Sequence, residues 1–391
     1  MKSWIEVSES RLRKNVSAIR AAAGENAEVL AVIKADGYGH GAELIAPVLV
    51  DAGVTWLGVD DVDEGARVRR ALGQRDARVM TMCGMELEDA DRIVEHRLTP
   101  VIWTPSHVEA LEAAGGRAGQ RVTAHLEIDG GMARQGAAPG AELERVVAAL
   151  QRTKWLRLEG VFSHLSSSEV REGRQTAAQL ERLEEALETI VGDGDFIPEL
   201  FHLANSSALD EGSTTEWLQR VAYNAGASVL VRPGLALYGY CLPIENENGS
   251  LPADVKGKLW HQVQPVLTWK ARIIGTREIQ PGQTVGYGAT FVAERPMRLA
   301  LLPVGYADGF RREASSGLGD GWVMIAGQRA PVVGRVSMNL TIVDVTAIPE
   351  AVEWDEATLL GEGVTAEDHA RWSGTIAYEI LCGVRSERRL V

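Results

Sequence analysis

Lys34 is the residue whose type and position point most directly to chemistry. It follows Ala31, Val32 and Ile33 at the end of an apolar run, within VIKADGYGHG. A lysine that emerges from a buried strand into a pocket can be partly desolvated, which suits its amine to Schiff-base formation and proton transfer. A lone lysine more often lays its stem on apolar surface and keeps its amine in water. The neighbouring residues must therefore decide between these two interpretations.

The residues after Lys34 favour a cofactor site. The glycines between positions 37 and 41 allow a tight backbone around Tyr38, and His40 is predicted to open a helix whose N-terminus could help receive an anion. An aldehyde cofactor that carries a phosphate would need both the amine and the anion site. We therefore interpret this segment as a site for such a cofactor.

The elements that would position these residues follow an alternating pattern from about residue 28 to 235. Short apolar runs typical of strands alternate with amphipathic stretches such as QTAAQLERLEEALETIV. The eight runs cover residues 29–34, 56–60, 78–82, 99–103, 122–128, 158–164, 199–204 and 229–233. Eight β-α units predict an α/β fold of the TIM (β/α)8 barrel type. A doubly wound open sheet is an alternative, because periodicity does not give the strand order.

In a TIM barrel the active site lies at the C-terminal ends of the strands, so polar residues at those positions are candidates. The candidates are Lys34, the loop of residues 129–134, His164, Asn205 with Ser206, and Arg232. After residue 240 a polar stretch is followed by β-branched runs with tight turns and few helical patterns. We therefore expect a barrel domain over residues 1–240, whose first few residues could pack with the second domain, and a mainly β domain over residues 241–391.

Composition excludes several classes of protein. The net charge of −14 argues against a nucleic-acid partner, and no apolar run reaches the length of about 18 residues needed to span a membrane. The histidines and the 3 cysteines are scattered without metal-ligand spacing, so we expect no metal site. Reduced thiols and the absence of an apolar leader in MKSWIEVSES indicate a cytoplasmic protein.

The segment KADGYGHG resembles the cofactor-lysine motif of the alanine racemase family. The resemblance continues along nearly the whole chain, and the order and spacing of the motifs are far more specific than any one of them. The further motifs are DGGMARQG (129–136), FSHLSSS (162–168), HLANSSA (202–208), RPGLALYG (232–239), VGYGATF (285–291), GYADG (305–309), VGRVSM (333–338) and GTIAYEIL (374–381).

This resemblance implies a barrel domain that binds pyridoxal phosphate, followed by a β domain, in a homodimer whose active sites take residues from both subunits. Lys34 would hold the cofactor as a Schiff base, and His164 would stack near the pyridine ring. The resemblance also implies phosphate contacts from Tyr38, Tyr378, Ser206 and the backbone around Gly234 and Leu235.

The implied reaction interconverts L-alanine and D-alanine through an external aldimine. Racemisation needs bases on opposite faces of the α-carbon, and the resemblance assigns Lys34 to one face and Tyr287 of the partner chain to the other. Arg232 would face the pyridine nitrogen. A guanidinium only donates hydrogen bonds, so that nitrogen stays unprotonated, which favours reprotonation at carbon over transamination. Arg134 and the backbone N–H of Met338 would hold the substrate carboxylate, and Tyr306 would support the tyrosines.

Two positions depart from the family pattern. Many members carry, in place of Glu127, a lysine that reacts with carbon dioxide, so here a carboxylate is encoded directly and would supply the charge beside Arg134. Asn339 replaces an aspartate. We therefore keep open a racemase of broader or different specificity, acting for example on serine or basic amino acids. A non-catalytic pyridoxal-phosphate-binding protein and a decarboxylase of the same plan are further alternatives.

Overall fold

The structure is a computed structural model that describes residues 2–191, 197–252 and 257–391. The chain divides into two compact units. We call Arg11–Ala35 with Ile45–Gln264 the barrel unit, and residues up to Ser10 with Asp36–Leu44 and Pro265–Val391 the β unit. The segment 241–264 thus lies in the barrel unit, and residues 36–44 lie in the β unit, two differences from a single division at residue 240.

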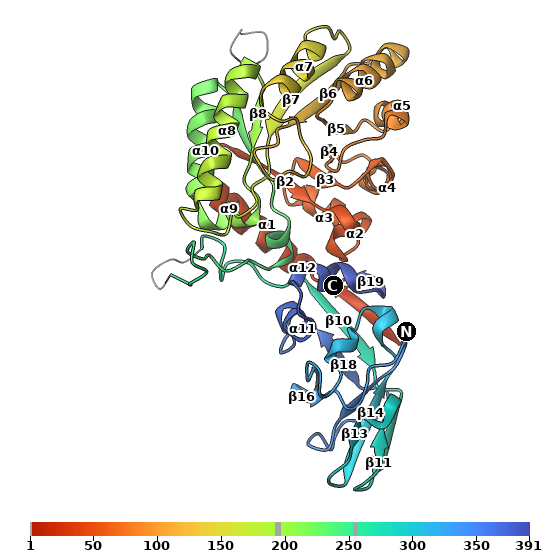
Figure 1. Cartoon of the computed structure of the whole chain (residues 1–391). Helices are drawn as coiled ribbons and strands as arrows, with labels where there is room; N and C mark the ends of the chain where they lie inside the picture. Colours follow the sequence, from red (N-terminus) through yellow and green to blue (C-terminus); the bar gives the residue numbers. More distant parts are fainter. Residues whose placement is uncertain (1, 192–196, 253–256) are drawn as a thin grey trace. The chain divides into compact units, whose positions relative to one another are not determined.

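Within the described residues of the barrel unit, eight parallel strands close into a barrel in chain order (Figure 1). The closing pair joins β9 to β2, with Ala27 opposite Val229. The strands are β2 (Ala27–Val32), β3 (Trp56–Val59), β4 (Arg78–Thr81), β5 (Thr99–Ile102), β6 (Val122–Glu127), β7 (Leu156–Phe162), β8 (Leu200–His202) and β9 (Ser228–Val231). A closed barrel confirms the predicted TIM fold and excludes the open sheet.

Helices connect successive strands and cover the outside of the barrel (Figure 1). Local sequence explains their ends: Thr104 caps α6 by accepting from the backbone N–H of His107, and Gly119 ends it in a left-handed conformation. The helices are α1 (Glu9–Ala23), α3 (Ala42–Asp51), α4 (Val62–Leu72), η1 (Leu87–Asp89), α5 (Ala90–Glu95), α6 (Pro105–Ala118), α7 (Ala141–Leu150), α8 (Arg174–Val191), α9 (Ser206–Glu211), α10 (Ser213–Ala225) and η2 (Leu235–Tyr238).

The β unit is built on a mixed sheet in the order β16-β15-β18-β10-β1-β19. Its members are β1 (Ser3–Val7), β10 (Leu267–Arg272), β15 (Trp322–Ile325), β16 (Gln328–Pro331), β18 (Glu356–Leu360) and β19 (Glu387–Leu390). The N-terminal strand β1 pairs with β10 on one side and with the C-terminal strand β19 on the other. The basic tail RSERRLV therefore contributes a strand, which the sequence pattern did not indicate.

Smaller sheets and short helices complete the β unit. The sheet β11-β14-β17 and the hairpin β12-β13 share a core that includes Ile279, Val285 and Met297. These elements are β11 (Gly275–Ile279), β12 (Thr284–Val285), β13 (Phe291–Val292), β14 (Met297–Leu302) and β17 (Thr341–Asp344), with η3 (Tyr287–Ala289), η4 (Tyr306–Asp308), η5 (Arg312–Ala314), α11 (Ala366–Ser373) and α12 (Ala377–Gly383). Strands dominate, as expected for a mainly β domain.

Candidate active site

Lys34 lies just beyond the end of β2. The strand ends at Val32, and the backbone N–H of Ile33 still donates to Gly58 O at 2.8 Å, so Lys34 starts the next element instead of closing the strand. That element is α2 (Lys34–Tyr38). The side chain of Lys34 is half-buried, and its Nζ lies 3.5 Å from Sγ of Cys83. Burial raises the pKa of the Cys83 thiol, so this neighbour is neutral near neutrality.

The turn after Lys34 has a left-handed backbone. Ala35, Asp36 and Tyr38 have φ values of 52°, 54° and 52°. Residues with a side chain pay roughly 1–2 kcal/mol each for this conformation, so the surroundings must hold it. Asp36 does part of this, because its carboxylate accepts from the backbone N–H of Ala42 at 2.9 Å and pairs with Arg388 at 3.0 Å. The next helix, α3, begins at Ala42, two residues later than predicted.

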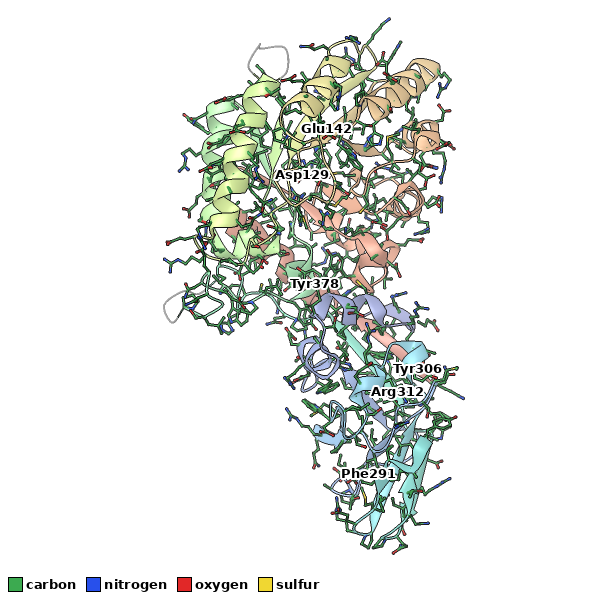
Figure 2. The ribbon with its side chains drawn as sticks, in the orientation of Figure 1. Asp129, Glu142, Phe291, Tyr306, Arg312 and Tyr378 are labelled. Atoms are coloured by element: carbon green, nitrogen blue, oxygen red, sulfur yellow. The ribbon has the colours of Figure 1, made fainter. Side chains whose placement is uncertain are left out.

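Tyr38 and Tyr378, both predicted at the phosphate, lie together in the β unit. Their ring centroids are 5.9 Å apart, and Tyr378 comes from α12 (Figure 2). Gly39 allows this close packing, since a Cβ at that position would lie 2.2 Å from Leu381 O. The neighbouring His40 is fully buried, and burial lowers its pKa to about 4. The His40 imidazole is therefore neutral near neutral pH, and the segment around Gly39 is tightly packed.

Arg232 is buried in the barrel unit and is held on several sides. Its Nη2 donates to Ser163 O at 2.9 Å and lies 3.3 Å from Nδ1 of His164, while Nη1 lies 3.1 Å from Nδ1 of His202. The guanidinium also lies 4.9 Å above the ring of Phe162. Burial lowers the pKa of Arg232 to about 10, which still leaves it protonated near neutrality. Burial lowers the pKa of His164 to about 3.

Ser206 and the segment that begins η2 are joined by hydrogen bonds. Ser206 is buried, and its Oγ accepts from the backbone N–H groups of Gly234 at 3.0 Å and Ala236 at 3.1 Å. Leu235 lies between them at the start of η2. A hydroxyl next to converging backbone N–H groups is a donor set that suits a phosphate. The structure thus brings together the predicted phosphate ligands Ser206, Gly234 and Leu235.

Glu127 is 2% exposed at the end of β6, and burial raises its pKa. Gln135 donates to its carboxylate and also to Met82 O, at 2.9 Å. Arg134 is exposed, and the charges of Arg232 and Arg134 oppose the effect of burial by lowering the pKa of Glu127. Sequence reasoning missed Gln135, although it directly follows Arg134 in DGGMARQG. Arg134, beside which Glu127 was expected to supply a charge, thus interacts with it through charge, and the hydrogen bond to Glu127 comes from Gln135.

The loop that carries Arg134 is organised by Asp129, labelled in Figure 2. Oδ1 of Asp129 accepts from the backbone N–H groups of Gly131 and Met132 at 2.9 Å, and from Ala133 at 3.1 Å. A single carboxylate oxygen therefore fixes the turn immediately before Arg134.

The remaining predicted residues are exposed in the β unit. Tyr287 is 71% exposed, Met338 is 56% exposed and Tyr306, labelled in Figure 2, is 45% exposed. Tyr287 opens η3 between Gly286 and Gly288, whose φ values are 77° and 75°.

Sequence reasoning also missed a set of buried ionisable residues in the barrel interior. His125, Glu159 and His202 are 0%, 4% and 1% exposed and contact one another. Each lies within a predicted strand, and the only signal was an ionisable residue in an otherwise apolar run.

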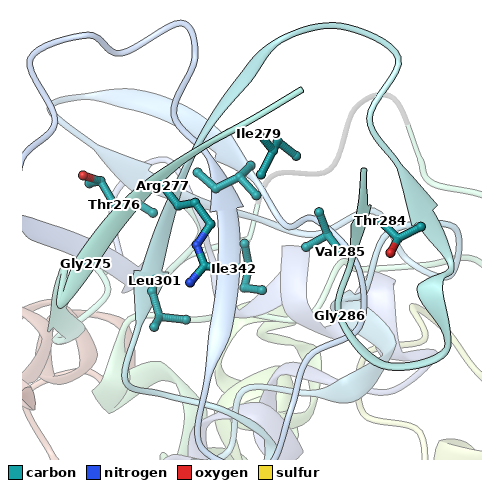
Figure 3. A pocket seen from close by; sticks show the side chains of 11 residues that line it. Gly275, Thr276, Arg277, Ile279, Thr284, Val285, Gly286, Leu301 and Ile342 are labelled. Carbon is teal, nitrogen blue, oxygen red and sulfur yellow. The ribbon is translucent and has the colours of Figure 1, made fainter. Parts of the chain in front are cut away.

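A cavity of about 250 Å³ lies elsewhere, in the β unit (Figure 3). Its walls come from β11, β12, β14 and β17, and Arg277 is among its lining residues. None of the predicted site residues lines it. Among the residues that the structure describes, no helix is long and apolar enough to cross a membrane, and no group of three His, Cys, Asp or Glu side chains is placed to hold a metal ion.

Comparisons with known proteins cover both units. The family model of the alanine racemase N-terminal domain matches residues 7–242, and that of the C-terminal domain matches residues 266–390. The alanine racemase of Syntrophobacter fumaroxidans is 36% identical over 390 residues, covering 99% of this chain and 96% of that protein.

Solved structures agree with these matches. The alanine racemase from Streptomyces coelicolor A3(2) has a TM-score of 0.84 and 33% identity, and the match covers 100% of this chain and 97% of that one. The alanine racemase from Bartonella henselae, solved with covalently bound pyridoxal phosphate, shares the fold with a TM-score of 0.81 and 24% identity over 100% of both chains. The matches extend over both domains and nearly the full length of the relatives. The protein is therefore an isomerase of the racemase type, and its chain belongs to the alanine racemase family.

Proposed function

We propose that this protein interconverts L-alanine and D-alanine with pyridoxal phosphate, using Lys34 and Tyr287 as the two bases. The observation that carries the proposal is the set of groups that follow the barrel strands. Lys34 follows β2, Ser206 follows β8 and Arg232 follows β9. The C-terminal ends of the strands are where TIM barrels place their active sites.

The chemistry of this set fits pyridoxal phosphate. Lys34 supplies an amine for the aldehyde, and Ser206 with the backbone at Gly234 and Leu235 supplies donors for the phosphate. We assign Tyr38 and Tyr378 to the phosphate as well. When bound, the cofactor attaches the substrate amine and withdraws electrons from its α-carbon, which makes the α-proton acidic.

Arg232 would keep this electron withdrawal moderate. It is buried and protonated, and it offers only donors, so an aromatic nitrogen facing it must accept a hydrogen bond and stay unprotonated. We place His164, which contacts Arg232, beside the same ring. A moderate electron sink favours return of the proton to the α-carbon, and this is what a racemase requires.

Two bases are needed because the proton leaves one face of the α-carbon and returns to the other. We assign Lys34 to one face and Tyr287 of a partner copy to the other. The 71% exposure of Tyr287 supports a role in contact with a second molecule. The functional protein would then be a homodimer.

The substrate carboxylate needs cationic and backbone donors. We assign Arg134 and the backbone N–H of Met338 to this carboxylate and Tyr306 to support of the neighbouring tyrosines. Glu127 would supply the negative charge that a carbamylated lysine supplies in other members. Its charge acts on Arg134 and on Arg232, while Gln135 holds its carboxylate in place.

The test is a panel of L-amino acids. The purified protein with pyridoxal phosphate is incubated with each one, and the enantiomers are separated by chiral chromatography. We expect alanine to approach equal amounts of both forms, and Lys34→Ala to lose the absorbance of lysine-bound cofactor together with almost all turnover. Preference for another amino acid would correct the substrate, and full activity of Lys34→Ala would refute the role of the lysine.

A further inference from the structure

A row of buried polar side chains crosses the interior of the barrel unit and ends at Arg232. Nδ1 of His202 lies 3.1 Å from Nη1 of Arg232, and Nε2 of His202 lies 2.8 Å from Nδ1 of His125. Nε2 of His125 in turn lies 3.3 Å from Oε2 of Glu159. At the far end, Arg78 donates to both carboxylate oxygens of Glu159, at 2.9 and 2.6 Å. Strands β6, β7 and β8 and the residue after β9 thus contribute one member each.

The two ends of this row force one direction on its hydrogen bonds. Arg232 can only donate, so Nδ1 of His202 must accept, and the ring proton of neutral His202 lies on Nε2. This N–H donates to Nδ1 of His125, which places the proton of His125 on its Nε2. That N–H points at Glu159, whose carboxylate can only accept. The reverse direction would set an N–H against the guanidinium and a lone pair against the carboxylate.

Both imidazoles are neutral, as this direction requires. Burial lowers the pKa of His125, and burial with the charge of Arg232 lowers the pKa of His202 well below its ordinary value. A neutral imidazole carries one proton, so each ring has a single tautomer. A protonated His202 would direct an N–H at the guanidinium.

The contacts of Arg232 engage three of its five N–H donors. Nη1 is engaged by His202, and Nη2 by Ser163 O and His164. Within the described parts of the chain, no hydrogen bond engages Nε of Arg232. Nη1 carries two hydrogens and meets one partner, so Nε–H and the second N–H of Nη1 are the donors that remain for a ligand.

We infer that Glu159 is a positioning residue for Arg232. It acts through His125 and His202, because its carboxylate accepts from His125 and so holds the two rings against the guanidinium, which fixes where Arg232 directs its remaining N–H donors. This inference rests on the proposed function, in which one of the remaining N–H groups of Arg232 meets the pyridine nitrogen. If Glu159 only filled space and satisfied a hydrogen bond, an amide at this position would serve His125 equally well.

The first test measures the tautomers of the wild-type holoprotein. Ring nitrogen-15 spectra of labelled histidine, assigned by the loss of signals in His125→Gln and His202→Gln, report which nitrogen carries the proton. We expect both rings to be neutral with the proton on Nε2 between about pH 6 and 8. An imidazolium, or a proton on Nδ1, at either ring would overturn the inference. The measurement is made on the wild-type protein, and the two variants serve only to assign its signals.

The second test changes the accepting end. Glu159→Gln can turn an N–H towards His125, which then loses its acceptor. We therefore expect mixed tautomers at His125, about tenfold lower kcat with KM for alanine little changed, and more pyruvate released per racemisation. That pyruvate reports abortive transfer of the amino group of alanine to the cofactor. Glu159→Asp keeps an accepting carboxylate and should retain the wild-type tautomers.

The matched control is Glu199→Gln, which removes a carboxylate paired with Arg157, itself a neighbour of Glu159. It should leave tautomers and pyruvate release unchanged. If wild type racemises alanine but Glu159→Gln changes neither the tautomers nor pyruvate release, the inference is wrong and the proposed function stands. If the tautomers are as expected but wild type neither binds the cofactor nor racemises alanine, the proposed function is wrong.

Discussion

The loop before Arg134 depends on one carboxylate oxygen, and this gives a prediction with a defined magnitude. Oδ1 of Asp129 accepts the three backbone hydrogen bonds from Gly131, Met132 and Ala133. Each is worth about 1 kcal/mol net, so Asp129→Ala should release the turn at a cost of about 3 kcal/mol. If Arg134 must then be ordered by the substrate, that energy is lost from transition-state binding. We expect kcat/KM for alanine to fall roughly 150-fold.

The assay is steady-state racemisation of L-alanine and D-alanine, with chemical unfolding measured on the same samples. Asp129→Asn keeps an accepting oxygen and should lose only about tenfold. The control is Glu142→Ala. Glu142 lies in the first turn of α7 (Figure 2), and it accepts a long hydrogen bond of 3.3 Å from the backbone N–H of Ala138. The kcat/KM of this variant should stay within about threefold of wild type. An Asp129→Ala variant that folds and keeps wild-type kcat/KM would refute the role given to this turn.

The other predictions concern the partner subunit, the encoded carboxylate and acid stability. Subunit exchange between Lys34→Ala and Tyr287→Phe protein should restore part of the activity by forming heterodimers with one intact site; demonstrated exchange without recovery would exclude a site completed by the partner. Wild-type racemase activity in degassed buffer should be the same with and without bicarbonate, because Glu127 is a carboxylate that needs no carbon dioxide. Glu127→Gln should racemise alanine more slowly, and a bicarbonate requirement in wild type would contradict the role of Glu127. Burial opposes ionisation of Glu159, but hydrogen bonds from His125 and Arg78 outweigh it and lower the pKa of Glu159 to about 2. This folded-state pKa lies below the unfolded value, so ionised Glu159 stabilises the fold above about pH 4.5 and this stabilisation is lost as the pH falls towards 2. At about pH 3 the free energy of unfolding of wild type should have fallen by about 2 kcal/mol from this source, and Glu159→Gln should lack this loss. Parallel curves of unfolding free energy against pH for the two proteins would contradict the prediction.

Local sequence determined much of this protein. The alternation of apolar runs with amphipathic stretches placed the barrel strands to within a few residues, because a parallel strand buried on both faces must be apolar over its length. The same logic pointed to Lys34 and Arg232, polar residues that follow such runs at the edge where TIM barrels carry their active sites. The motifs predicted the family, and the comparisons confirmed it.

Tertiary structure decided what depends on residues distant in the chain. The glycines after Lys34 allow a tight backbone, but the left-handed conformation of Ala35 and Tyr38 could not be predicted, because it is unfavourable locally and the turn is held in part by Arg388. Pattern alone could not show that the tail forms β19 beside β1, or that Gln135, not Arg134, donates to Glu127. His125 and Glu159 are ionisable residues within otherwise apolar predicted strands. Only closure of the barrel brings them to His202 and Arg232, where burial makes each hydrogen bond obligatory and its direction unique.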